Sequence, residues 1–339
     1  MHPHLLSLAC QLYATSPDLL IPLSGGHSNA VYKFPLQKTS KEFKTREVLK
    51  FGVLRIGVQD CPVEQTLAML EWACFLHDQG APFTAPLPSA NHHLLEQLEY
   101  EGTHYIITAF QNVEGTLAEN IPASEWTDDL FCSVGSAAGK FHRISLGYTP
   151  SSPELTRPMW FDSYEIVEAT QLLASSTDPA RERLATLVEG LKQLPMEPSD
   201  FGLIHDDLHF ANFLILPDGK ISIIDFDDCG YSWFAMDVAM ALFDILVLYD
   251  PVNEADKQSF ARRFLSNYLA GYRTEKEISQ YWLEQIPHFL KLKELCIYAT
   301  LIGHTEVAQP GSWVGRFMRG RSERIAGDVP YVDIDYTAL

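Results

Sequence analysis

The sequence predicts an α+β protein in two parts, a β-rich N-terminal lobe and a mostly helical C-terminal lobe. The chain has 339 residues, about twice the length of a typical domain. Its first 110 residues contain alternating apolar runs bounded by glycine and proline, as strands do, and one helical pattern. From Ser124 onward the spacing of apolar residues becomes mostly helical. We therefore expect one lobe over residues 1–111 and a second over 112–339.

The expected elements of the N-terminal lobe follow from the positions of its glycines, prolines and apolar runs. Residues 23–34 (LSGGHSNAVYKF) place glycines before an alternating run, which indicates two strands joined by a glycine-rich turn. A further strand is expected over 47–56, and a helix over 63–79 is closed by Gly80. Two short strands, 94–100 and 104–110, flank Gly102.

The C-terminal lobe is expected to be helical apart from one β island. The periodicity predicts helices over 126–143, 162–174, 179–193, 233–248, 254–272 and 278–303. The island comprises a strand over 202–205, a loop to Asn212, and a hairpin whose second strand ends near Asp225. Because a hairpin returns the chain to its starting end, the loop and Asp225 are expected to face one site.

Charge and cysteine usage exclude several classes of protein. The formal net charge is −19, of which −16 falls in residues 112–339, so broad binding to nucleic acid or to an anionic membrane is disfavoured. The six cysteines show no metal-binding spacing and fit a reducing, cytoplasmic setting. No secretory signal and no membrane segment are predicted. The sequence does not indicate an oligomeric state.

The densest group of polar residues lies in the β island. Residues 205–212 read HDDLHFAN, and Asp225 ends an apolar strand thirteen residues after Asn212. Phosphoryl transfer requires a carboxylate at the attacking hydroxyl and oxygen ligands for Mg²⁺. This spacing can supply both.

The same residues resemble the aminoglycoside phosphotransferase and choline kinase branch of the protein-kinase-like fold. The family's catalytic loop reads HGDLHxxN and its metal strand ends in IDFDD, and this chain has HDDLHFAN and IIDFDDCG. The run PLSGGHSNAVYKF resembles the phosphate-loop hairpin, and GVLRI resembles the strand that carries the phosphate-pairing base. The resemblance covers most of residues 20–245. It implies a two-lobed kinase-like fold with ATP held between the lobes.

The resemblance also implies roles for residues of the C-terminal lobe. Asp207 would be the catalytic base that orients the acceptor hydroxyl, while Asn212 and Asp225 would bind Mg²⁺. His205 would brace the loop, and Asp237 would support it from a helix, although an acid near a helix start is also favourable when it simply faces solvent.

Further roles are implied for the nucleotide site. The backbone of Gly25 and Gly26, with the side chains of Ser28 and Asn29, would contact the phosphates. Ala109, Phe110 and Gln111 would form a connector whose backbone groups face adenine.

The phosphate-pairing base has two candidates. Arg55 would hold the α- and β-phosphates and pair with Glu71 on the first helix, and its apolar flanks favour it. Lys50 is the competing residue.

One position departs from the family pattern. The family's glycine is Asp206 here, and its side chain is expected to face solvent because neighbouring side chains diverge. A glycine with positive φ would not be replaced without cost, so the path of the loop is an open question.

Several functional alternatives remain at this level. The chain is predicted to be an ATP- and Mg²⁺-dependent phosphotransferase acting on a hydroxyl of a small acceptor, with a cationic acceptor favoured by the acidic C-terminal lobe. The alternatives are a protein Ser/Thr kinase, a metal-dependent phosphohydrolase and a non-catalytic nucleotide-binding scaffold.

Two groups of side chains have ambiguous roles. The acceptor pocket could be lined by five aromatic residues that core packing would also explain, Trp160, Phe161, Tyr231, Trp233 and Phe234. Four arginines near the C-terminus could form a packed amphipathic helix or an anion-binding arm, Arg316, Arg319, Arg321 and Arg324.

Overall fold

The computed structural model describes residues 1–23, 29–36, 50–302 and 312–339. The chain divides into two compact units, one comprising Met1–Glu114 with Tyr148–Thr156 and the other Gly115–Gly147 with Arg157–Leu339. The first is rich in strands and the second in helices, so the predicted α+β class is confirmed. The return of Tyr148–Thr156 to the first unit was not predicted from the sequence.

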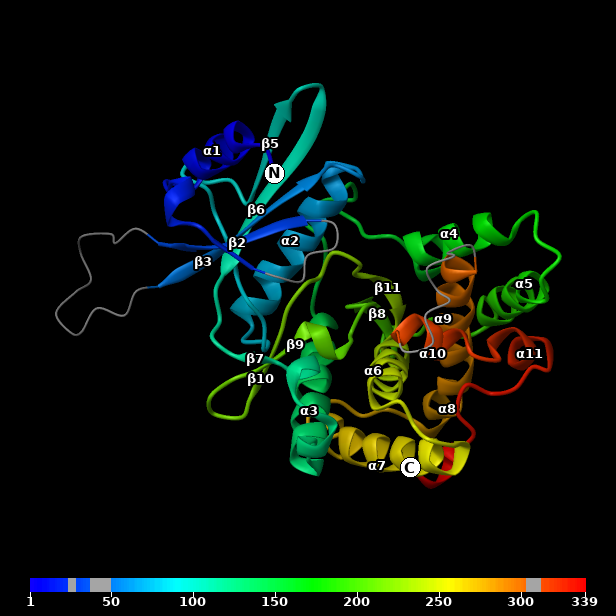
Figure 1. Ribbon diagram of the computed structural model, residues 1–339. Helices are drawn as coiled ribbons and strands as arrows, with labels where there is room; N and C mark the ends of the chain where they lie inside the picture. The colour runs from blue at the N-terminus through cyan, green and yellow to red at the C-terminus, as the bar shows by residue number, and fades with distance from the viewer. Residues whose placement is uncertain (24–28, 37–49, 303–311) are drawn as a thin grey trace. The chain divides into compact units, whose positions relative to one another are not determined.

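The first unit is built on an antiparallel sheet (Figure 1). Its strands in the described residues are β1 (Ile21–Pro22), β2 (Asn29–Pro35), β3 (Phe51–Val58), β4 (Pro86–Leu87), β5 (Leu95–Tyr100) and β6 (Thr103–Gln111). The order is β1-β2-β3-β6-β4, with β5 also paired to β6. Strand β6 is therefore central, with β3 on one side and β4 and β5 on the other.

One face of this sheet carries a hydrophobic core. Alternate residues of β3, Leu54 and Ile56, are buried together with Phe34 and Ile107. The first helix, α1 (Pro3–Leu12), closes this core, because the ring of Tyr13 at its C-terminal end is buried there. Since side chains alternate along a strand, Arg55 lies on the opposite face of the sheet. The second helix, α2 (Val63–Asp78), matches the predicted span to within a residue, whereas α1 was not predicted.

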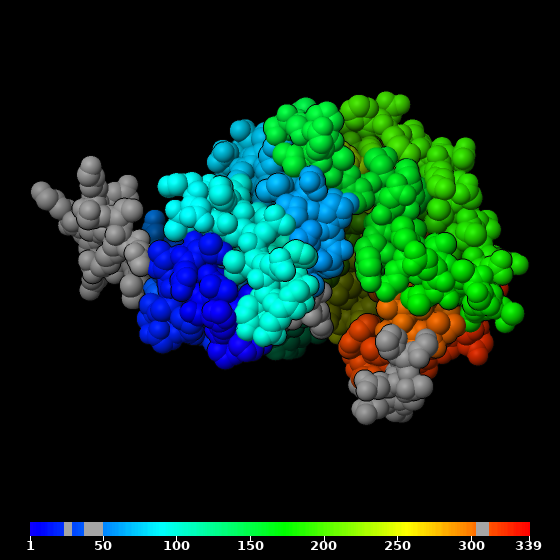
Figure 2. Space-filling view, turned by 90° about the horizontal axis from the view of Figure 1, so that it is seen from above, coloured from blue at the N-terminus to red at the C-terminus, as the bar shows by residue number. Residues whose placement is uncertain are grey.

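The second unit is mostly helical in the part of the chain that the structure describes. Its helices are α3 (Asp128–Ser145), α4 (Tyr164–Leu173), α5 (Ala180–Leu191), α6 (Phe234–Tyr249), α7 (Glu254–Tyr272), α8 (Gln280–Leu283), α9 (Ile286–Leu301), α10 (Trp313–Met318) and α11 (Arg321–Ala326). Helix α9 packs against α4, α5 and α6. Figures 1 and 2 both show the green α4–α5 region beside the orange and red helices near the C-terminus. None of the helices described here is long and apolar enough to cross a membrane.

The helix predicted over 278–303 is divided in two. Helix α8 ends at Leu283, and α9 begins at Ile286 with a proline in its first turn. Proline is favoured at the start of a helix and disfavoured in its interior, because it lacks the N–H that interior positions donate. Pro287 therefore marks the start of a new helix.

Two small sheets carry the polar loop of the second unit. One has the order β10-β9-β7 and the other pairs β11 with β8; their strands are β7 (Thr116–Leu117), β8 (Phe201–Ile204), β9 (Phe213–Ile215), β10 (Ile221–Ile223) and β11 (Gly230–Trp233). The predicted hairpin is present, with Phe213 opposite Ile223. Beyond this pair, the Ile224 N–H donates to the Asn212 carbonyl at 3.0 Å. The loop after β8 and the segment after β10 thus meet at one end of the hairpin.

Glycines allow α3 and α7 to approach closely. A Cβ at Gly135 would lie 1.9 Å from the Tyr268 carbonyl oxygen, and one at Gly271 would lie 1.9 Å from that of Cys132. Any side chain at these positions would force the helices apart. This close packing brings His142 of α3 beside Tyr272 of α7.

Candidate active site

Asp207 lies in the loop after β8, within a network of polar contacts. Its Oδ2 is 3.0 Å from His209 Nε2, and its carbonyl accepts a hydrogen bond from Asn212 Nδ2 at 2.9 Å. Burial raises the pKa of Asp207, but the hydrogen bond and charge of His209, with the charge of Lys293, bring it well below its ordinary value. The group is therefore a fixed carboxylate, able to accept a hydrogen bond from an incoming hydroxyl.

Asp206 has the left-handed backbone conformation expected of the glycine that it replaces. Its φ is +66°, and its N–H donates to Asp237 Oδ1 at 2.9 Å. Such a conformation costs a non-glycine residue about 1–2 kcal/mol, although Asp and Asn tolerate it better than most. The loop therefore keeps a path suited to glycine. The expectation that the Asp206 side chain faces solvent was wrong, because it lines a pocket among aromatic residues.

The buried carboxylate of Asp237, on α6, holds the start of the loop. It accepts hydrogen bonds from the backbone N–H groups of His205 and Asp206, each at 2.9 Å, and lies 2.9 Å from His142 Nε2. Asp237 therefore supports the loop from α6. The alternative that it faces solvent does not hold, because Asp237 is fully buried.

A second layer of the same network consists of imidazole and phenol groups. His142 Nδ1 lies 2.9 Å from the Tyr272 hydroxyl. Burial lowers the pKa of His142 despite the opposing effect of Asp237, so its ring is neutral. His205 Nε2 lies 2.9 Å from the Ile224 carbonyl, which ties the loop to the end of β10.

Asn212 and Asp225, the expected metal ligands, lie at the same end of the β9–β10 hairpin. The Asn212 amide nitrogen points to Asp207, which leaves the amide oxygen as its available ligand. Asp225 follows β10 with a φ of +64°. Amide and carboxylate oxygens suit Mg²⁺, which usually takes its remaining ligands from phosphates and water. No cluster of three or more His, Cys, Asp or Glu side chains suited to a metal occurs among the described residues.

Hydrogen bonds from the Arg157 side chain fix the backbone of the acidic segment that follows Asp225. Arg157 donates from Nε to the Cys229 carbonyl at 2.6 Å and from a terminal nitrogen to the Asp227 carbonyl at 2.5 Å. Burial, together with the charges of Asp207 and Asp227, raises the pKa of Asp228 to about 6. A bound cation would relieve the repulsion among these carboxylates. The oxygens of Asn212 and Asp225, with these acids beside them, therefore fit a divalent metal.

The first unit contains the residues expected at the nucleotide. Arg55 lies in the middle of β3, opposite Val31 and Thr108, with its guanidinium 5.8 Å from the centroid of the Phe110 ring. Lys50 precedes the strand and is exposed, which supports Arg55 as the phosphate-pairing base. Asn29 begins β2, whereas Gly25, Gly26 and Ser28 lie outside the described residues.

Glu71 does not pair with Arg55 in this structure, which corrects the sequence prediction. Its carboxylate accepts hydrogen bonds from the Tyr148 hydroxyl at 2.6 Å, from the Ser151 N–H at 2.9 Å and from the Ser151 hydroxyl. Burial raises the pKa of Glu71, but these donors lower it overall. The returning segment Tyr148–Thr156 supplies the neutral donors, and this long-range contact leaves no pattern in the sequence.

The prediction that residues 109–111 form a connector is also wrong, because these residues complete β6. Ala109 pairs with Leu54 of β3 and with Leu87 of β4, and the Gln111 N–H donates to the Ala85 carbonyl at 2.8 Å. The sheet thus uses backbone groups that were expected to face adenine.

Two functional side chains were not found from the sequence. His209 is part of the HDDLHFAN motif, so its spacing two residues after Asp207 was an available signal. Lys293 gave no such signal, because it stands among other charged residues of α9, Lys291 and Glu294, and belongs to no motif. Its Nζ is 2.8 Å from one oxygen of Glu165 and 2.9 Å from the other. Burial lowers the pKa of Lys293, but Glu165 and Asp207 raise it overall, so it remains charged.

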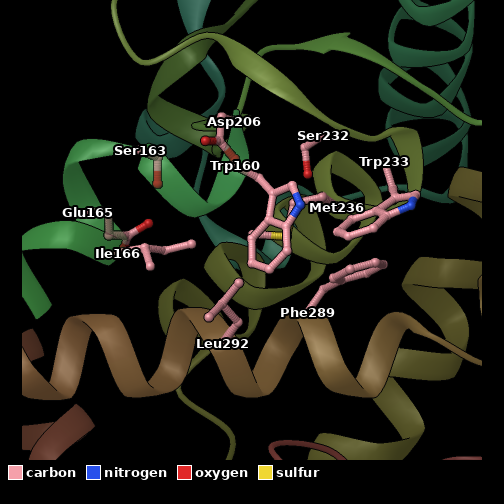
Figure 3. A pocket seen from close by; sticks show the side chains of 10 residues that line it. All are labelled: Trp160, Ser163, Glu165, Ile166, Asp206, Ser232, Trp233, Met236, Phe289 and Leu292. Carbon is pink, nitrogen blue, oxygen red and sulfur yellow. The ribbon is translucent and has the colours of Figure 1, made fainter. Parts of the chain in front are cut away.

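Of the five aromatic residues predicted to line a pocket, Trp160 and Trp233 do so (Figure 3).

The C-terminal arginines behave mainly as packing residues. Arg321 pairs with the buried carboxylate of Glu294, and Arg316 and Arg324 pair with Asp250 and Glu254. These ion pairs within the chain support packing over the anion-binding arm, but the expected single helix is divided into α10 and α11. The structure records no ion pair for Arg319 with another described residue.

Comparison with known proteins places this site in a family. A profile of the phosphotransferase enzyme family matches residues 20–278. The chain belongs to this family. It is therefore an enzyme that transfers a phosphoryl group, as the sequence predicted, and the phosphohydrolase alternative loses its support.

Individual relatives agree with this assignment. The chain is 29% identical over 271 residues to an amicoumacin kinase of Bacillus subtilis, covering 80% of this chain and 79% of that protein. Its fold is similar to that of an amicoumacin kinase solved with AMP-PNP, Ca²⁺ and Ami, with a TM-score of 0.85, 25% identity, and coverage of 99% and 96% of the two chains. A microcompartment-associated aminopropanol kinase shares the fold at 22% identity, with a TM-score of 0.66 and coverage of 96% and 98%. The kinase-like fold is confirmed.

Proposed function

We propose that this enzyme transfers the γ-phosphoryl group of ATP, in the presence of Mg²⁺, to a hydroxyl group of a small molecule that carries an amine. The observation that carries the proposal is the ionised carboxylate of Asp207, whose Oδ2 lies 3.0 Å from His209 Nε2 and 3.4 Å from Asn212 Nδ2, at the end of the β9–β10 hairpin. Phosphoryl transfer relies on positioning and electrostatic stabilisation, and such a carboxylate can orient an attacking hydroxyl.

The surrounding residues have distinct roles in this proposal. Asp207 would accept a hydrogen bond from the acceptor hydroxyl and take its proton as the oxygen bonds to phosphorus. Asn212 and Asp225 would hold Mg²⁺, which, when bound, neutralises charge on the phosphates. Arg55 would bind phosphate oxygens with its planar guanidinium.

The class of acceptor is supported by charge and by the relatives. The C-terminal lobe carries most of the negative charge of the chain, which favours a cationic molecule over an anionic one. Relatives and structural neighbours are named for their action on amicoumacin and aminopropanol. We also assign the enzyme to the reducing cytoplasm, since all six cysteines are free thiols.

A screen for ADP release with Mg-ATP tests the proposal. The acceptors would be amicoumacin, 1-amino-2-propanol, ethanolamine, choline, an aminoglycoside and casein, with mass spectrometry of each product. We expect a phosphorylated small amine. ATP hydrolysis without any phosphorylated product, binding of Mg-ATP without turnover, or phosphorylation of casein alone would each contradict the proposal.

A further inference from the structure

A small pocket in the second unit lies beside the catalytic loop. It lies between α4, α6 and α9, and three large aromatic side chains, Trp160, Trp233 and Phe289, form much of its wall. Two carboxyl groups, Asp206 and Glu165, line the same pocket (Figure 3). The pocket thus combines aromatic rings with acidic groups.

Two polar groups of this pocket have no partner within the described part of the chain. The Asp206 carboxylate accepts no hydrogen bond and forms no ion pair there, although its own N–H is bound to Asp237. The Trp160 Nε1–H is buried without an acceptor. Buried polar groups are normally paired, because leaving one unpaired costs free energy. The open Asp206 carboxylate is suited to a cationic ligand, whereas the Trp160 N–H requires an acceptor, which a hydroxyl group can supply and an ammonium group cannot.

The positive charge of Lys293 acts on Asp206 but does not pair with it. Lys293 is held by both oxygens of Glu165, at 2.8 and 2.9 Å. Burial and the charges of Asp237 and Glu165 raise the pKa of Asp206 well above its ordinary value, even though Lys293 lowers it. Asp206 therefore bears an uncompensated cost of ionisation, which a second cation would remove.

We infer that this pocket receives the ammonium group of the acceptor, with Asp206 as its counter-ion and Trp160 and Trp233 beside it. The inference rests on the proposed function and specifies how the acceptor is recognised. Aromatic faces attract cations, and a charge-assisted hydrogen bond to a partly buried carboxylate such as that of Asp206 is among the stronger polar contacts. Asp206 directly precedes Asp207 in the chain, so the pocket lies next to the residue proposed to orient the hydroxyl, although Asp207 itself does not line the pocket.

Enzyme kinetics test this role with a matched set of variants. Asp206→Asn removes the charge and keeps the shape, and Asp206→Gly restores the family's glycine; both residues tolerate a positive φ. We expect KM for 1-amino-2-propanol to rise about 10- to 100-fold in both variants, with a smaller change in kcat. The control is Asp328→Asn, at another aspartate with a positive φ, 53°, which pairs with Arg183 and does not line the pocket. An unchanged KM in both Asp206 variants would overturn the inference.

Direct binding separates failure of this inference from failure of the proposed function. Titration calorimetry without ATP would compare 1-amino-2-propanol with 2-butanol, in which a methyl group replaces the ammonium group. Wild-type protein should bind the amine at least about tenfold more tightly, and Asp206→Asn should abolish the difference. Equal affinities, no binding of the amine, or an unaltered preference in Asp206→Asn would overturn the inference. Turnover in the acceptor screen would still test phosphotransfer independently of this result.

Discussion

Removal of the Asp237 carboxylate should destabilise the enzyme strongly. The carboxylate accepts two backbone hydrogen bonds from consecutive loop residues and contacts His142, all at 2.9 Å and all buried. Each hydrogen bond to a charged group contributes about 1.5–3 kcal/mol, but such terms overlap when the groups share one acceptor. Breaking a buried charged network by removing one member costs about 3–5 kcal/mol. We therefore expect Asp237→Ala to lower the free energy of unfolding by that amount.

The assay is urea denaturation followed by circular dichroism, with a control on the same helix. Asp244 accepts one backbone hydrogen bond, from the Phe210 N–H at 2.8 Å, so Asp244→Ala should cost about 1–3 kcal/mol. Asp237→Asn keeps one carbonyl acceptor, so its loss in the free energy of unfolding should lie between those of the two alanine variants. If Asp237→Ala cost no more than Asp244→Ala, the three-contact network would not hold the loop as described.

Two further predictions concern the acidic segment after β10. The folded state raises the pKa of Asp228 to about 6, so its ionisation opposes folding: stability is lost as the pH rises from about 4 to about 6 and stays lost above. Asp228→Asn should therefore raise the free energy of unfolding by about 1 kcal/mol at pH 7, less than the full pKa shift would give because the exposed side chain is screened by solvent, and by much less at pH 4. The control Asp129→Asn, at an exposed acid of α3, should change it little at either pH, and equal effects of Asp228→Asn at both pH values would count against this cause. Asp225→Ala should weaken the Mg²⁺-dependent affinity for AMP-PNP at least about tenfold by titration calorimetry, and an unchanged Mg²⁺ dependence would rule out Asp225 as a ligand.

Local patterns in the sequence were sufficient for most elements of the fold. Apolar periodicity located α2, α3 and α7, and the turn between β9 and β10 was evident from Pro217-Asp218-Gly219. These features depend on residues that are close in the sequence. The same holds for the loop motif, whose members act within eight residues of one another.

The features that were missed depend on contacts between distant parts of the chain. Glu71 is 80 residues from Ser151, so its hydrogen bonds with the returning segment could not be seen in either local sequence. Lys293 is 128 residues from its partner Glu165, and the local sequence of α9 does not distinguish it from its charged neighbours Lys291 and Glu294. Asp206 illustrates a third case. Its backbone has a positive φ and its side chain lines the pocket, whereas the expectation from the sequence rested only on the divergence of neighbouring side chains.

The central claim is that Asp207 acts on the acceptor hydroxyl in ATP-dependent phosphotransfer. The most direct measurement uses Asp207→Asn, with AMP-PNP affinity by titration calorimetry and phosphoryl transfer to the acceptor found in the screen. We predict an affinity for Mg-AMP-PNP close to that of the wild type and a rate of transfer lower by at least about a hundredfold, in the range usual for loss of general base catalysis. Transfer at the wild-type rate, or loss of nucleotide binding in place of transfer, would contradict the account.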